Sequence, residues 1–170
     1  MKAHVVEMAR YNAWANLRLY RMAAALTDEQ YRRDVGAYFK SLHGTLNHLL
    51  TADLIWLHRL TGTGVAPGKL DAVICEDLPS LTAERQQTDQ RLLDFVQGLS
   101  STRIEGSWEY RALNGAPQTK SIREVLAHLF NHQTHHRGQA HMILTVLGVV
   151  EPEPLDLLIM QRERHQGSSS

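Results

Sequence analysis

The 170-residue sequence contains one cysteine, Cys75, so no disulfide can form within the chain. Such sparing use of cysteine is typical of proteins from a reducing compartment. No stretch is both apolar enough and long enough to span a bilayer, and the N-terminal segment becomes polar too early for a signal peptide. These absences predict a cytoplasmic protein.

The chain also lacks a net charge, because 18 lysine and arginine residues balance 18 aspartate and glutamate residues. This balance gives no electrostatic reason to expect a nucleic-acid partner or an anionic membrane partner. The sequence shows no glycine-rich phosphate loop, no dinucleotide fingerprint and no nucleophile–histidine–acid triad. Cys75 lies in a predicted loop without a partner that would activate its thiol, and its role stays open.

Four long segments carry apolar residues at the spacing of an amphipathic helix. The fourth begins with a capping box formed by Ser121 and Glu124, and it ends before Gly148. The predicted helices are approximately His4–Leu26, Ser41–Leu60, Pro79–Leu99 and Ser121–Leu147.

Between the third and fourth helices, residues 102–120 alternate in polarity and contain Asn114-Gly115, a strong hairpin-turn signal. We therefore expect one all-α domain over residues 1–166, an antiparallel four-helix bundle with a small hairpin or extended excursion before its last long helix. A short terminal helix or strap is expected at Leu155–Gln161. Residues 167–170 are expected to be a flexible tail outside the fold.

Histidine is abundant, with 10 residues, and four of them fall between His128 and His136. His132 and His136 lie on the apolar stripe of the fourth helix, one helical turn apart, so their rings can share one metal ion. The alternative is that each is a buried histidine with its own hydrogen-bond partners. His128 lies about 12 Å along the axis from His136, too far to share that ion, so we interpret it as a neighbouring polar residue.

A third ligand has to come from another helix, and the second predicted helix offers His43, His48 and His58. Periodicity does not choose among these three residues, because that helix is apolar on most sides. His48 is weakly favoured, since small residues on its row allow a neighbouring helix to approach closely.

Three segments carry a resemblance to a known family: Tyr11–Asn16, Leu46–Leu50 with Trp56–Arg59, and Asn131–Gln139. Together they resemble the DinB (damage-inducible) family, within the DinB/YfiT-like superfamily of metalloenzymes. That superfamily includes bacillithiol-transferase-like and mycothiol-dependent maleylpyruvate-isomerase-like members. The resemblance implies an up-down-down-up four-helix bundle, a homodimer, and a three-histidine metal site that falls on His48, His132 and His136.

Three neutral imidazoles leave an ion with its full charge and at least one open position, which is the catalytic pattern for Zn²⁺. Ni²⁺, Fe²⁺ and Mn²⁺ also suit imidazole ligands. Such a site can activate water or a small thiol, which predicts a metal-dependent transferase or hydrolase with a small-molecule substrate, including a low-molecular-weight thiol. The alternatives are a non-catalytic metal-binding or dimerisation module linked to stress or DNA damage, and a plain bundle with buried histidines.

Four further residues are candidates for the surroundings of this site: Gln139, Asn16, Asp53 and His128. Gln139 is expected either to orient a ligand or to be a surface amide, and Asp53 either to support a ligand or to be a surface charge. Asn16 is expected to bond across helices or to line the pocket. For Arg137 we expect a salt bridge on the surface, and the alternative is a contact with an anionic group of the substrate.

Overall fold

A computed structural model describes residues 1–167 of the chain. Its four long helices are α1 (Lys2–Ala23), α3 (Leu42–Thr61), α4 (Leu78–Gly98) and α6 (Ile122–Val146). The shorter elements are α2 (Asp28–Arg32), α5 (Ser101–Glu105), β1 (Ser107–Arg111), β2 (Pro117–Ser121) and α7 (Leu157–Gly167). In this part of the chain, no helix combines the length and the apolar character that crossing a membrane requires.

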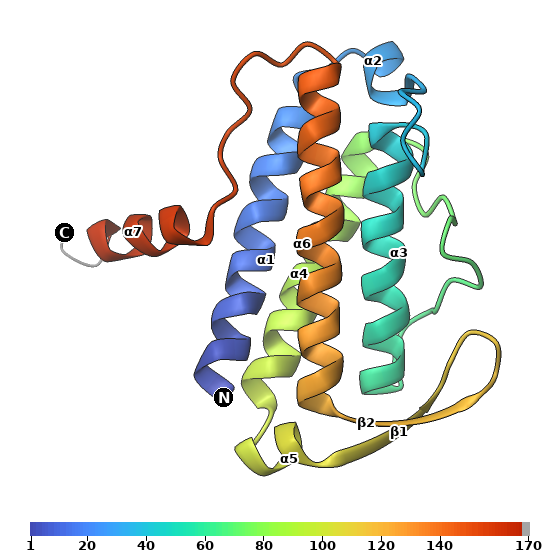
Figure 1. The fold of residues 1–170 in the computed structure, drawn as a ribbon, viewed down its shortest axis with the longest axis vertical. Coiled ribbons are helices and arrows are strands. Elements are labelled where there is room, and N and C mark those ends of the chain that lie inside the picture. The colour runs from blue at the N-terminus through green and yellow to red at the C-terminus, as the bar shows by residue number, and fades with distance from the viewer. Residues whose placement is uncertain (168–170) are drawn as a thin grey trace.

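The four long helices form a bundle with the predicted up-down-down-up order. Figure 1 shows α1 running up from the end that carries the N-terminus, α3 and α4 both running back, and α6 returning. Because α3 and α4 point the same way, residues 62–77 must cross the bundle lengthwise, a distance of about 30 Å for a helix the length of α3. This crossing loop therefore lies alongside the helices and can contribute to a site on their surface.

The local signals at the start of α6 behave as predicted. Glu124 N–H donates to the Ser121 hydroxyl, and the Glu124 carboxylate accepts from Ser121 N–H, which completes the capping box. The preceding hairpin pairs β1 with β2 in antiparallel register, and Gly115 takes a positive φ of 82° in its turn. The short helix α5 before this hairpin was not predicted.

The C-terminal boundary differs slightly from the prediction. Helix α7 starts at Leu157 and ends at Gly167, so it runs beyond Gln161 and includes one residue that was assigned to the tail. Residues 168–170, the remainder of the predicted tail, lie outside the described part of the chain.

The core of the bundle consists of two large apolar clusters, one toward each end, separated by buried polar side chains at mid-height. A third, small cluster forms where Met160 of α7 packs with Tyr11 and Ala15 of α1. These polar residues come from all four long helices, and we call them the polar layer: Asn12, Asn16, Asp53, Arg85, Asp89, Gln133 and Arg137. Arg85 Nη2 lies 2.7 Å from Asp53 Oδ2 and 2.9 Å from Asp89 Oδ1. The guanidinium is therefore paired within the core, as a buried charge must be.

The surface position expected for Arg137 was wrong, and so was the surface alternative for Asp53. Arg137 does not form a surface salt bridge: it is 2% exposed and donates to the amide oxygens of Asn12 and Asn16. Asp53 is not a surface charge either, because it is 1% exposed and accepts from Gln133 at 2.7 Å. A charged side chain on a helix is assigned to the surface by default. Partners on α1 for Arg137, and on α4 and α6 for Asp53, make these two burials tolerable.

Candidate metal centre

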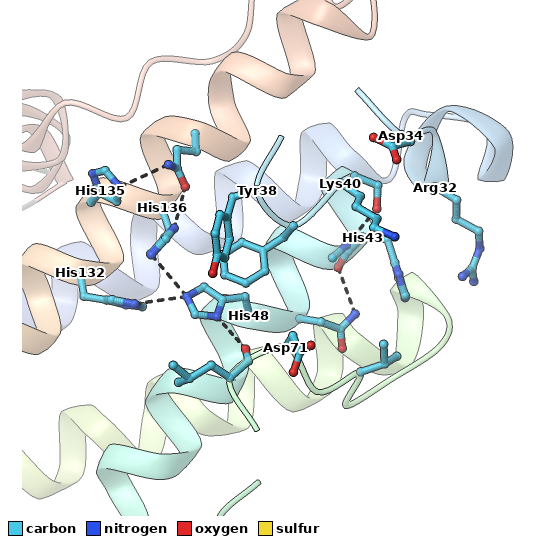
Figure 2. Close-up of a pocket in the computed structure, with 17 residues that line it drawn as sticks. Arg32, Asp34, Tyr38, Lys40, His43, His48, Asp71, His132, His135 and His136 are labelled. Carbon is cyan, nitrogen blue, oxygen red and sulfur yellow. Dashed lines mark hydrogen bonds between the residues drawn. The ribbon is translucent and has the colours of Figure 1, made fainter. Parts of the chain in front are cut away.

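Three histidines from two helices point toward one another at the surface of the bundle. His48 comes from α3, and His132 and His136 come from α6 (Figure 2). The Nε2 atom of His48 lies 3.2 Å from Nε2 of His132 and 3.3 Å from Nε2 of His136. Within residues 1–167, this histidine cluster is the only group of three or more histidine, cysteine or acidic side chains close enough to share an ion.

The packing of α6 against α3 sets the position of these rings. Gln133, which lies between the two α6 histidines in sequence, is fully buried and faces α3. Its side-chain amide donates to the Leu49 carbonyl at 2.9 Å and to the Asp53 carboxylate at 2.7 Å. These bonds join the two helices at the residue that follows His48, so they hold both sources of imidazole in one register.

The outer nitrogens of two rings identify their tautomers. His48 Nδ1 lies 2.7 Å from the Leu70 carbonyl oxygen, and His136 Nδ1 lies 2.6 Å from the Gln139 amide oxygen. Both oxygens can only accept, so each Nδ1 carries the hydrogen and each neutral ring has a lone pair on Nε2. The 3.3 Å contact between these two Nε2 atoms is therefore not a hydrogen bond, because neither atom has a proton to donate.

The surroundings also disfavour protonation of the cluster. Burial, followed by the neighbouring His136 and His48 rings, lowers the pKa of His132 to about 3. Burial also lowers the pKa of His48 and of His136, against smaller opposing effects of their Nδ1 hydrogen bonds. At neutral pH the three rings are thus uncharged and present their Nε2 atoms to a common point, which is what a metal ion requires of imidazole.

The spacing of the nitrogens fits such an ion. Two zinc–nitrogen bonds of roughly 2.0–2.1 Å that meet at a tetrahedral angle place their nitrogens about 3.3–3.4 Å apart. The His48 nitrogen lies 3.2 Å and 3.3 Å from its two neighbours. A shared cation would also relieve the repulsion between lone pairs that face each other. The donor set and its geometry therefore fit a divalent ion.

The cluster lies in the wall of an open cleft of about 1020 Å³, which we call the histidine cleft. The Phe39 ring stacks on the His48 ring with centroids 3.9 Å apart and covers one face of it. Farther along the cleft lie Arg32 and Lys40, as Figure 2 shows. Phe39 was missed by the sequence analysis, because it lies in an irregular loop where no periodicity predicts which way a side chain points.

The crossing loop closes another side of the histidine cleft, and α3 holds it by side-chain bonds. The buried Asn47 amide oxygen accepts from the backbone N–H groups of Ile74 and Cys75 at 2.7 Å and 3.1 Å. Thr51 donates to the Ala72 carbonyl at 3.2 Å. With the bond from His48 to Leu70, three residues of one α3 face fix this loop beside the cluster.

The other sequence candidates lie at varying distances from the cluster. Gln139 contacts His136 directly, as expected of a residue that orients a ligand rather than of a surface amide. Asp53 reaches the site only through Gln133, and Asn16 lies in the polar layer, bonded to Asp89. His128 is exposed, with its ring 5.9 Å from that of His132.

Two histidines of α3 that spacing left open lie apart from the cluster. His43 Nε2 lies 3.3 Å from the Cys75 carbonyl oxygen, and His58 Nδ1 lies 2.8 Å from the Gly64 carbonyl oxygen. The structure thus brings together His48, His132 and His136, the same three residues that the resemblance had implied.

Fold and site together define a four-helix-bundle protein with a three-histidine cluster suited to a metal. Residues 1–166 match the model of the DinB family, and the chain belongs to this family. It is 25% identical over 158 residues to Protein DinB of Bacillus subtilis strain 168, covering 87% of this chain and 88% of that protein. The crystal structure of a DinB-like protein from Bacillus cereus is similar in fold, with a TM-score of 0.64 at 20% identity, over 85% of this chain and 91% of that one.

Proposed function

We propose that this protein is a metal-dependent transferase or hydrolase in which His48, His132 and His136 hold one divalent ion, Zn²⁺ in the first instance. The observation that carries the proposal is the convergence of the Nε2 atoms of three uncharged imidazoles on one point in the wall of an open cleft. An imidazole site that opens onto a cleft of about 1020 Å³ leaves room for a small molecule beside the ligands. That access favours an enzyme over a module that only stores or senses a metal.

When bound, a divalent ion supplies Lewis acidity, which lowers the pKa of water or of a small thiol. The residues of the chain prepare the site for that chemistry. Gln139 and the Leu70 carbonyl hold the Nδ1 protons of His136 and His48, which keeps both Nε2 lone pairs directed into the site. Phe39 covers one face of His48 and excludes water from it.

The first test is metal content. We expect about one Zn²⁺ per chain by mass spectrometry of untagged protein, with loss of the ion in His48→Ala, His132→Ala and His136→Ala. His43→Ala is the matched control, because His43 lies on the same helix but bonds to the crossing loop rather than the cluster. Wild-type protein that stays free of Zn²⁺, Ni²⁺, Fe²⁺ and Mn²⁺ after incubation with each would refute the proposal.

The second test is turnover. Metal-loaded protein should transfer a small thiol to an electrophile, or hydrolyse a thiol conjugate, in a panel of such pairs, and each cluster variant should lose this activity. Tight metal binding without turnover would favour the alternative, a non-catalytic module. The homodimer and the cytoplasmic location are also proposals. Light scattering of the purified protein and fractionation of source cells would test them.

A further inference from the structure

A second cavity, of about 350 Å³, lies beside the histidine cleft and has a different character. It is formed by the end of α3, the hairpin and α6, and its lining includes Trp56, Tyr110 and Leu113. Figure 1 shows the hairpin extending from the base of α6 past the end of α3, which places its residues against this part of the bundle. We call this cavity the aromatic pocket.

The aromatic pocket and the histidine cleft share two wall residues. Leu70 and His132 line both spaces, so the partition between them is one apolar side chain and one of the proposed metal ligands. A molecule seated in the aromatic pocket would therefore have one end next to the proposed ion. The two spaces fit one substrate better than they fit two unrelated ligands.

A cationic group without an acidic partner lies in this pocket. The Arg59 guanidinium packs over the Trp56 ring, 4.8 Å from its centroid, and lies 5.5 Å from the Tyr110 centroid. Among the described residues, Arg59 forms no ion pair with a carboxylate, whereas Arg18, Arg85 and Arg123 each do. A guanidinium packed over a ring has its planar face occupied but leaves its N–H edge available, and that edge matches a carboxylate in a bidentate pair.

The walls also select the body of the ligand. Trp56 and Tyr110 provide ring surfaces, and Ala52, Ile55 and Leu70 provide apolar ones, which suits a flat apolar body. Trp56 follows His48 by eight residues on α3, about 12 Å along the axis, so a ligand that pairs with Arg59 and also reaches the histidine cluster must bridge roughly that distance, contacts at both ends included. A fused ring system or a ring with a short chain bridges more of this distance than benzoate does.

We infer that the aromatic pocket binds an aromatic carboxylate, whose carboxylate pairs with Arg59 and whose opposite end lies beside His132. This inference rests on the proposed function, since it names the class of substrate on which the metal site acts. The hairpin then has a defined role, because Tyr110 and Leu113 form the wall of the pocket against which the aromatic ring packs. The electrophile of the proposed reaction is accordingly an aryl acid that carries its reactive group away from the carboxylate.

The test is a binding experiment with 2-naphthoate, compared with the neutral 2-naphthamide and the non-aromatic cyclohexanecarboxylate. We expect saturable calorimetric binding of 2-naphthoate that Arg59→Met weakens at least tenfold. Binding of 2-naphthamide should change less than twofold in the same variant. Arg103→Met, which removes an exposed arginine of α5, is the matched control and should leave both affinities unchanged.

A second variant tests the pocket independently, in case Arg59→Met does not fold. Leu113 is 53% exposed, so Leu113→Trp should fill the pocket from the hairpin without disturbing the core, and it should abolish 2-naphthoate binding. If 2-naphthoate does not bind, or binds equally to Arg59→Met, the inference is refuted, and Arg59 serves only to pack the hairpin onto α3. Metal content measured on the wild-type samples separates the two ideas. Wild-type protein that holds metal but does not bind 2-naphthoate overturns the pocket alone, and wild-type protein that binds 2-naphthoate but takes up no metal overturns the metal site alone.

Discussion

The hydrogen bond between Gln139 and His136 offers a direct test of the tautomer argument. The Gln139 amide oxygen accepts from His136 Nδ1 at 2.6 Å and thereby directs the lone pair of the other ring nitrogen into the site. Gln139→Leu removes the acceptor while keeping a side chain of similar size. The His136 ring can then rotate or shift its proton to Nε2, and either change removes a ligand atom.

The expected magnitude follows from this single bond. Loss of a hydrogen-bond partner that orients a metal-ligating histidine typically lowers metal affinity about 10–100-fold. That range corresponds to about 1.4–2.8 kcal/mol of binding free energy. The effect should not approach that of His136→Ala, because the ring itself remains and the Leu70 carbonyl still orients His48.

Competition with a chromogenic chelator at pH 7 would measure the zinc affinity of wild type and of each variant. Gln139→Glu keeps an acceptor at the same position and should retain affinity within a few-fold of wild type. His135→Ala removes the other side-chain contact of Gln139, the 3.3 Å contact between the two side-chain nitrogens, and should leave affinity unchanged. Equal affinities in wild type and Gln139→Leu would refute the reasoning.

Three further predictions concern stability, each measured by urea unfolding of the metal-free protein. Arg85→Met leaves the buried carboxylates of Asp53 and Asp89 without their cation and should cost about 3–5 kcal/mol, or about 6–20 °C in Tm; a loss below 1 kcal/mol would contradict the account of the polar layer. Burial raises the pKa of Asp53 to about 6, against the opposing effect of Arg85. The folded state therefore binds the Asp53 carboxyl proton more tightly than the unfolded chain does, and wild type loses this stabilisation as pH rises from 4 to 6.5. Asp53→Asn has no such proton to lose, so its stability relative to wild type should increase over this range; a stability difference that does not vary with pH would contradict the raised pKa. Ser121→Ala removes the acceptor of the Glu124 N–H bond and should cost about 1 kcal/mol; an unchanged free energy of unfolding would contradict the role of this cap.

The features that were predicted from the sequence are those that repeat with the period of a helix. The apolar stripe of α6 passes through His132 and His136, so their common face follows from geometry within one helix. The capping box at Ser121 and the Asn114-Gly115 turn are likewise local, because all of their partners lie within a few residues. Which α3 histidine faces α6 is a matter of packing between helices, and only the family resemblance selected His48.

The features that were missed depend on partners distant in sequence. Arg137 and Asp53 carry charges, and a charged residue on a helix is assigned to solvent unless its partner is known. Their partners lie on other helices, 121–125 residues away for Arg137 and 80 residues away for the Gln133 bond of Asp53. Phe39 and Leu70 meet His48 from irregular segments, where no repeat predicts the direction of a side chain.

The polar layer also has a consequence for the alignment of the helices along their axes. Leucine surfaces resemble one another from turn to turn, so an all-apolar bundle tolerates a helix shifted by about 5.4 Å, one turn. Charged and amide groups find their partners in a single alignment only. A shifted α6 would place Arg137 and Gln133 against apolar side chains, without hydrogen-bond partners. Substitutions in this layer are thus expected to make the position of His132 and His136 relative to His48 less well defined. Metal affinity should then fall in variants that keep their helical content.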